Sequence, residues 1–178
     1  MIDLAQTIKQ AEQGDAQAQL LLGEYYDGED GVEKDFEKAA YWIQKAANQN
    51  FAEAQNLLAC YYFNGYGVEE SKETAVKLYK LATKQKYVWA IYNLADCYRR
   101  GKGVEQDLEK SNELSAQAFK LLMEKAEQGD VEAQNHIGKS YELGLGVEKD
   151  LDIAMKWYKK SASQGYKWGQ WNVDRIEN

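Results

Sequence analysis

The sequence predicts an all-α fold, a solenoid of stacked antiparallel helix hairpins, and three observations support this prediction. The 178 residues include no proline, the residue that helix interiors exclude most strongly. Apolar residues recur at intervals of three and four along most of the chain, as they do on one face of a helix. Four similar segments begin at residues 18, 54, 90 and 133, and repeats of this length are typical of solenoids.

The repeats set the order of the predicted elements. A capping helix is expected over residues 2–14 and another over residues 166–178, because the terminal repeats of a solenoid must present a polar outer face. Between the caps, each repeat is expected to form one hairpin, whose first and second helices are joined by a turn. The predicted repeats are residues 15–50, 51–86, 87–129 and 130–165. We therefore expect a single solenoid domain over residues 1–178.

The first helix of every repeat carries an apolar stripe with a spacing of four residues. In the first repeat the stripe consists of Ala18, Leu22 and Tyr26. Its equivalents are Ala54, Leu58 and Tyr62; Ala90, Leu94 and Tyr98; and Ala133, Ile137 and Tyr141. Ala allows two helices to approach closely, Leu or Ile fills the space between them, and Tyr buries its ring while its hydroxyl reaches water. The stripe therefore predicts the face on which the hairpins pack.

Glycines and helix caps mark the turns within the hairpins. In the second, third and fourth repeats, the first helix is expected to end at a glycine in the left-handed conformation. These glycines are Gly65, Gly101 and Gly144. Each second helix is expected to begin after a side chain that accepts hydrogen bonds from free backbone N–H groups. These caps are Asp35, Asp107 and Asp150, with Ser71 in the second repeat.

The second helices carry a recurring tryptophan, Trp42 and Trp157, which we expect in the core. In the third repeat the second helix is seven residues longer and runs from Asp107 to about Gln128. Seven residues are close to two helical turns, so the apolar face stays nearly in phase. The extension is interpreted either as a tolerated, solvent-exposed addition or as an extra contact surface.

These features follow one frame, A-Q-x-x-L-G-x-x-Y-x-x-G-x-G-V-x-x-D. After this frame comes an Ala-rich helix that carries Trp and ends near Q-G. The frame closely resembles the Sel-one-like repeat (SLR) family, which is related to the tetratricopeptide repeats, and the resemblance covers nearly the whole chain. Ile91, at the position of the Gln of the frame, is a departure. The resemblance implies a right-handed superhelix whose first helices line a concave groove, and a role as an adaptor that binds other proteins.

Composition excludes several classes of function. The 22 Lys and Arg against 29 Asp and Glu give a net charge of −7, so binding of nucleic acid through its phosphates is not expected. We find no apolar run long enough to span a membrane and no export signal, so neither a membrane nor secretion is expected. The two cysteines, Cys60 and Cys97, do not indicate a disulfide framework. We therefore expect a cytoplasmic location.

The side chains needed for catalysis are scarce. His136 is the only histidine, which excludes a metal site built on several imidazoles. Carboxylates are abundant, but nearly all fall at turns and helix starts, where capping explains them. We therefore expect no catalytic residue, no metal, no cofactor and no small-molecule ligand, and we expect that the protein is not an enzyme.

Partner-binding residues are expected at first-helix positions that vary while the scaffold repeats. Two aromatic pairs at i, i+3 stand out there, Trp89 with Tyr92 and Trp168 with Trp171, because rigid aromatic side chains often dominate binding energy. The alternative, that these pairs pack against a neighbouring repeat or cover the end of the core, stays open. Further candidates at the variable positions are Glu53, Asn56, Asn93, Asp96, Asn135, His136 and Lys139.

Residues 24–37 form an acidic rim, with seven acidic side chains against one lysine. Within this rim, Glu29, Asp30 and Glu33 are candidates for attracting a basic partner, because an acidic edge beside a groove speeds its capture. The alternative is that these charges only solvate a turn.

The sequence therefore predicts a bacterial, cytoplasmic, non-enzymatic module that binds a partner protein in a concave groove. One hypothesis is an immunity or antitoxin protein that neutralises a cognate bacterial toxin. The alternative is a regulatory adaptor or scaffold in a signalling or envelope pathway. A hydrolase of the β-lactamase-like type, as in some disulfide-rich relatives, is less favoured, because the paired cysteines of those relatives are missing.

Overall fold

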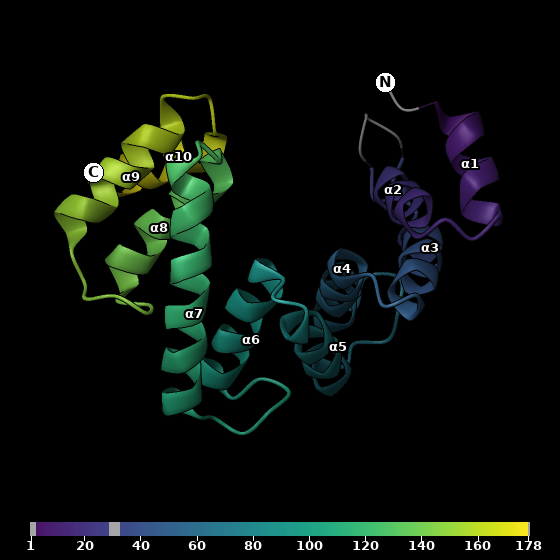
Figure 1. Ribbon diagram of the computed structural model, residues 1–178, viewed down its shortest axis with the longest axis horizontal. Coiled ribbons are helices and arrows are strands. Elements are labelled where there is room, and N and C mark those ends of the chain that lie inside the picture. The colour runs from purple at the N-terminus through teal and green to yellow at the C-terminus, as the bar shows by residue number, and fades with distance from the viewer. Residues whose placement is uncertain (1–2, 29–32, 178) are drawn as a thin grey trace. The chain divides into compact units, whose positions relative to one another are not determined.

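A computed structural model describes residues 3–28 and 33–177, and this part of the chain contains ten α-helices and no β-strand (Figure 1). The helices are α1 (Leu4–Glu12), α2 (Ala16–Tyr26), α3 (Phe36–Asn48), α4 (Ala52–Asn64), α5 (Lys72–Lys84), α6 (Val88–Arg100), α7 (Leu108–Glu127), α8 (Val131–Leu143), α9 (Leu151–Ala162) and α10 (Lys167–Glu177). The even-numbered helices are the predicted first helices, and α3, α5, α7 and α9 are the second helices of the four repeats. The predicted all-α class is confirmed, and helices α1 and α10 are present where the capping helices were expected, while their role as caps stays a prediction.

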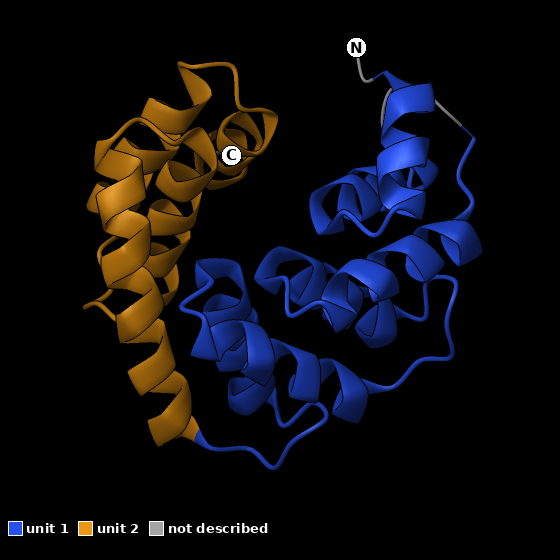
Figure 2. Ribbon diagram, turned by 45° about the vertical axis from the view of Figure 1, so that its right-hand side comes forward, with its two compact units in different colours: residues 1–107 blue, residues 108–178 orange. Residues whose placement is uncertain are grey.

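The chain divides into two compact units, which Figure 2 colours separately. Unit 1 comprises residues 1–107 and holds α1 to α6, and unit 2 comprises residues 108–178 and holds α7 to α10. The prediction of a single domain over the whole chain stays a prediction.

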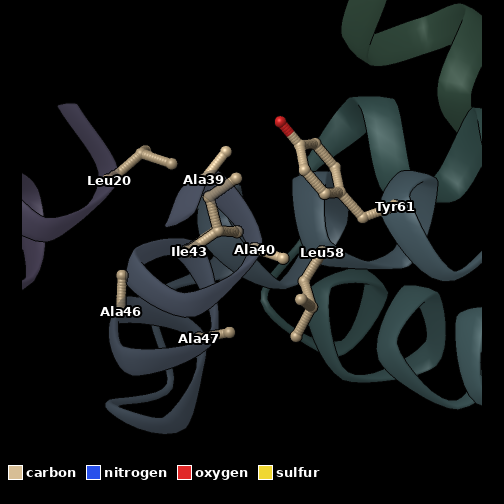
Figure 3. Packing of buried hydrophobic residues seen from close by; sticks show 9 residues of the cluster. Leu20, Ala39, Ala40, Ile43, Ala46, Ala47, Leu58 and Tyr61 are labelled. Carbon is tan, nitrogen blue, oxygen red and sulfur yellow. The ribbon is translucent and has the colours of Figure 1, made fainter. Parts of the chain in front are cut away.

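Within each unit, every helix packs against the next one along the chain. In unit 1, α2 packs against α3 and α4 against α5 within the hairpins, while α3 packs against α4 and α5 against α6 between them. In unit 2, α8 packs against both α7 and α9, and α9 packs against α10. Figure 3 shows the core of unit 1, where Ala39 and Ile43 of α3 lie between Leu20 of α2 and Leu58 and Tyr61 of α4. Small side chains on α3 therefore allow two first helices to approach the same second helix.

The predicted glycines end the first helices in the left-handed conformation, with φ of 73° at Gly65, 63° at Gly101 and 71° at Gly144. The second glycine of the turn, Gly67, has φ of 63°. It lies directly on the first turn of α3, as shown by the overlap that a Cβ at this position would have with the Phe36 carbonyl. The turn after α4 is thus packed against the preceding hairpin.

The predicted caps also form. Asp35 Oδ1 accepts a hydrogen bond from the Lys38 backbone N–H at 3.0 Å, and Asp150 Oδ1 accepts one from the Ile153 backbone N–H at 2.9 Å. In α5 the cap is the Ser71 hydroxyl, which accepts from the Thr74 backbone N–H at 3.2 Å. Asp107 directly precedes α7, as predicted.

The tryptophans of the second helices lie at the edge of the core rather than inside it. Trp42 and Trp157 are half-buried, which corrects the prediction that they are core residues. The fully buried position is the next residue along each helix. These residues are Ile43, Tyr79, Leu122 and Tyr158. Both positions fall within the apolar face that helical spacing defines, so spacing alone does not separate them.

Helix α7 is the extended second helix, with 20 residues against 13 in α5. A Cβ at Gly146 would overlap the backbone of Ser115, just as Gly67 approaches Phe36 at the start of α3. The extra two turns therefore lie at the beginning of α7, over residues 108–114. Leu108 is 57% exposed, but Ser111 and Leu114 are buried. The extension thus continues the buried face of the helix, as expected from an apolar face that stays nearly in phase. Its interpretation as a tolerated addition or as an extra contact surface stays a prediction.

Helix α10 differs from the other first helices at the position where they contact their second helix. Each first helix of a hairpin contacts its second helix closely at a small residue. In α8 this residue is Gly138, where a Cβ would lie 3.1 Å from the Ala154 carbonyl of α9. The equivalent residues of the other first helices are Gly23, Ala59, Ala95 and, in α10, Asp174. Asp174 is exposed and accepts a hydrogen bond from Gln170 Nε2 at 2.8 Å. An exposed, hydrogen-bonded aspartate of α10 therefore stands at the position where α8 contacts α9 through a glycine.

Candidate binding pocket between α8 and α10

Unit 2 contains a pocket of about 570 Å³ lined by residues of α8, α9 and α10 and by Tyr166. This volume is within the range of ligand-binding pockets, about 300–1,000 Å³. Of the residues predicted for partner binding, the lining includes Asn135, His136, Lys139, Trp168 and Trp171. The structure therefore brings these candidates from α8 and α10 together at one site.

Trp168 and Trp171 contribute exposed aromatic surface to the pocket lining, which also includes Leu143, Tyr158 and Tyr166. Their side chains are 61% and 53% exposed, and their rings meet edge to face with 6.2 Å between centroids. The Arg175 guanidinium lies 5.3 Å from the centre of the Trp171 ring. The buried side of α10 instead presents Val173, which packs with Tyr158 of α9. The two tryptophans are thus more exposed than buried, and a partner-binding role for them stays a prediction.

An ion pair joins α8 to α10 in the pocket. Arg175 Nη2 donates hydrogen bonds to Glu142 Oε1 at 2.9 Å and Oε2 at 2.7 Å, and the Tyr158 hydroxyl donates to Glu142 Oε2 at 2.7 Å. Burial alone would raise the pKa of Glu142, but the hydrogen bonds from Arg175 and Tyr158 outweigh burial and hold that pKa below its usual value. The Glu142 carboxylate is therefore charged and already bound on both oxygens.

The charged side chains of the pocket lining include more cations than carboxylates, although the whole chain is acidic. Burial, together with repulsion from Lys139, lowers the pKa of His136 to about 4, so its ring is neutral at pH 7. The remaining charged groups of the lining are Lys139, Arg175 and Glu142. The lining itself therefore holds two cations and one carboxylate, and the carboxylates of Asp130 and Glu132, outside the lining, also act on His136 and Tyr166.

Two asparagines, Asn135 and Asn172, bridge α8 and α10 beneath the pocket. Asn172 Nδ2 donates to Asn135 Oδ1 at 2.9 Å, and Asn135 is only 7% exposed. Unit 1 repeats this bridge between α4 and α6, where Asn93 Nδ2 donates to Asn56 Oδ1 at 3.0 Å. Sequence reasoning chose Asn56, Asn93 and Asn135 as partner contacts but missed the bridges. The sequence feature that could have identified these bridges is an Asn–Asn separation of 37 residues in both units.

The other candidates lie in unit 1. Glu53 is exposed and accepts a hydrogen bond from the Tyr87 hydroxyl at 3.3 Å. Trp89 and Tyr92 are half-buried on α6. Asp96 is paired with Arg100 at 2.9 Å and with Arg99. A partner-binding role for these residues stays a prediction.

Of the acidic rim, Glu33 is exposed and lines a second pocket of about 640 Å³ near the start of α3, together with Lys34 and Lys38. Glu29 and Asp30 lie outside the described residues.

Neither a metal cluster nor a membrane span is found in the part of the chain that the structure describes. Over residues 3–28 and 33–177, no three or more His, Cys, Asp and Glu side chains are grouped so that they could hold a metal ion. Within the same ranges, no helix is both long and apolar enough to cross a membrane.

A comparison with protein families decides what kind of repeat this is. The Sel1 repeat model matches residues 16–51, 52–87, 90–121 and 131–166. The chain belongs to the Sel1 repeat family. The resemblance to Sel-one-like repeats is thereby confirmed, and Sel1 repeat proteins are generally protein–protein interaction modules.

Solved Sel1 repeat structures show the same fold. The structure of c5321, a protective antigen of uropathogenic Escherichia coli strains with an SLR fold, matches 95% of this chain at 36% identity and a TM-score of 0.63. A Sel1 repeat protein from Oxalobacter formigenes matches 97% at 28% identity and a TM-score of 0.62. These matches confirm the solenoid of helix hairpins.

The chain spans only part of these relatives, 35% of the Escherichia coli chain and 58% of the Oxalobacter chain. A putative sel1-like repeat-containing protein of Acanthamoeba polyphaga mimivirus is 38% identical over 53 residues, which are 30% of this chain and 10% of that protein.

Proposed function

We propose that this Sel1 repeat chain is a non-enzymatic protein-binding module and that its partner binds at the pocket between α8 and α10. The observation that carries this proposal is the exposed tryptophan pair, Trp168 and Trp171, on the pocket lining. Exposed rigid aromatic side chains beside a pocket are the groups that most often dominate a protein interface.

The pocket is held in shape before any partner arrives. The Glu142–Arg175 ion pair and the Asn135–Asn172 bridge each connect α8 to α10. A site on helices fixed in this way loses little conformational entropy on binding, so the aromatic contacts contribute more fully to affinity.

A finer part of the proposal is that the partner is a bacterial toxin, which this chain neutralises as an immunity protein in the cytoplasm. The net charge of −7 supports a partner that is basic overall, because an acidic protein accelerates the approach of a basic one. The solved relatives from Escherichia coli and Oxalobacter support a bacterial setting. The alternative is that the chain is a regulatory adaptor, and identification of the partner distinguishes the two roles.

The test compares three tagged forms of the chain purified from cells that naturally produce it. They are the wild type, Trp168→Ala/Trp171→Ala, and the matched variant Trp89→Ala/Tyr92→Ala from the half-buried pair on α6. We expect the pocket variant to lose the copurifying partner, which mass spectrometry identifies, and to keep its helical circular dichroism. A folded pocket variant that retains the partner contradicts the proposed site. Loss only in the α6 variant would move the site to unit 1.

A further inference from the structure

The charged groups of the α8–α10 pocket restrict what can enter it. Glu142 is the one acidic residue of the lining, and its two oxygens accept hydrogen bonds from Arg175 and Tyr158. A basic side chain that approaches Glu142 is repelled by the Arg175 guanidinium, whose Nη2 already forms an ion pair with Glu142 and hydrogen bonds to both of its oxygens. An acidic side chain is not subject to this repulsion from Arg175.

We infer that the pocket recognises an acidic segment of the partner, in which a carboxylate side chain adjoins a large apolar one. The apolar side chain packs on Trp168 and Trp171, and the carboxylate lies near Lys139, which lines the same pocket. This inference rests on the proposed function and adds the chemistry of the bound segment.

The physical basis is the excess of cations over carboxylates in the lining of a site that also offers exposed aromatic surface. Lys139 and Arg175 outnumber Glu142, and His136 remains neutral at pH 7 because burial lowers its pKa. Charge complementarity selects between segments of similar shape, and a like charge placed in such a site is disfavoured. The pocket therefore prefers negatively charged segments, whereas the acidic chain as a whole attracts positively charged partners.

The probes are three peptides of equal length with blocked ends, so that side chains supply the only charges. The acidic peptide is acetyl-Ser-Gly-Leu-Phe-Glu-Asp-Gly-Ser-amide. The basic peptide has Lys-Arg in place of Glu-Asp, and the neutral peptide has Gln-Asn there. Fluorescence anisotropy of labelled peptides at low ionic strength gives the dissociation constants, and tryptophan emission of the protein reports contact with Trp168 and Trp171. We expect the acidic peptide to bind at least about tenfold more tightly than the basic one.

Variants of Lys139 distinguish the contribution of the pocket to the binding preference from the contribution of the charge of the whole chain. Lys139→Gln is expected to remove most of the preference, and Lys139→Glu to reverse it. Lys156→Glu makes the same charge change on an exposed residue of α9 outside the pocket lining, and it is expected to keep the preference. Trp168→Ala/Trp171→Ala is expected to weaken the binding of all three peptides. Circular dichroism checks the fold of each variant, and Lys139→Gln serves alone if Lys139→Glu unfolds.

Each result bears on a definite claim. Equal or tighter binding of the basic peptide overturns the acidic-segment inference, and so does an equal response to Lys139→Glu and Lys156→Glu. Absence of binding by all three peptides at about 1 mM also overturns it. None of these results contradicts the protein-binding function, which fails only if the partner remains bound to the folded tryptophan variant.

Discussion

Gln55 and Gln85 are hydrogen-bonded to each other across the hairpin of α4 and α5, with 2.9 Å between Gln85 Nε2 and Gln55 Oε1. Gln55 is buried, and its own amide donates to the Ala47 carbonyl at the end of α3 at 3.5 Å. The same pairing joins Gln19 to Gln49 at 2.8 Å and Gln134 to Gln164 at 2.7 Å. One buried glutamine thus connects its first helix to the ends of two second helices. This connection explains the Gln that follows Ala in the repeat frame.

Replacing Gln134 by alanine is expected to destabilise the protein by about 1–3 kcal/mol, because a buried carbonyl then loses its donor. In the wild type, Gln134 is fully buried, donates to the Ala126 carbonyl at 3.1 Å and accepts from Gln164. Urea unfolding measures the difference, with the exposed Gln117→Ala on α7 as the control. Equal stabilities of the two variants would show that the glutamine pair contributes nothing to the fold.

The fold could be predicted from the sequence because each repeat encodes it locally. Ala39 and Gly65 each satisfy a requirement of their own helix or turn, and the same residue type recurs at the position of Ala39 in all four repeats and at that of Gly65 in three. The errors arose where a prediction needed finer resolution than helical spacing provides. Trp42 and Ile43 both lie on the apolar face, and only the packing of neighbouring helices determines that Ile43 is fully buried.

The candidate site could be predicted only in part. The i, i+3 spacing of Trp168 and Trp171 was enough to place both side chains on one helix face. Glu142, in contrast, lies outside the variable positions, and its role depends on contacts with Arg175 and Tyr158 from two other helices. Such contacts follow from the way that α8, α9 and α10 pack, which no local pattern encodes. The excess of cations over carboxylates in the pocket lining was missed for the same reason.

Two glycines of one turn provide a matched comparison of backbone strain and close packing. Gly65 and Gly67 are both exposed and have φ of 73° and 63°. Gly65→Ala is expected to cost about 1 kcal/mol, the cost of the left-handed conformation, because its nearest neighbour to a Cβ is 3.5 Å away. Gly67→Ala is expected to cost more than about 3 kcal/mol, because its Cβ would also overlap the Phe36 carbonyl. Thermal unfolding of both variants gives the difference, and equal costs would contradict the packing of this turn on α3.

The half-buried imidazole of His136, whose pKa is lowered, predicts a loss of stability in mild acid. Burial and Lys139 lower its pKa in the folded protein to about 4, whereas the unfolded chain has the usual value near 6.5. The unfolded state therefore binds more protons between these values, and stability falls as the pH decreases from 6.5 towards 4. Between pH 7 and pH 5, we expect the wild type to lose about 2 kcal/mol more than His136→Asn. Urea unfolding across this pH range measures both, and parallel pH profiles would contradict the half-buried, neutral ring.

The two thiols are expected to react slowly while the protein is folded. Burial, with repulsion from Asp96, raises the pKa of Cys97 to about 11. Burial also raises the pKa of Cys60, partly offset by its hydrogen bond with the Tyr79 hydroxyl at 3.3 Å. Because the thiolate is the reactive form, alkylation of Cys97 at pH 8 should be at least about 100-fold slower than in the unfolded chain.

Iodoacetamide labelling followed by mass spectrometry of the cysteine-containing peptides resolves the two sites. The Cys60→Ser variant leaves Cys97 as the only thiol, and labelling in urea provides the rate for the unfolded chain. Protection should vanish in urea, because unfolding returns the thiol to water and its pKa to the ordinary value. A native rate for Cys97 equal to the unfolded rate would show that α6 opens faster than the reagent reacts, and would contradict a stably packed first helix in this repeat.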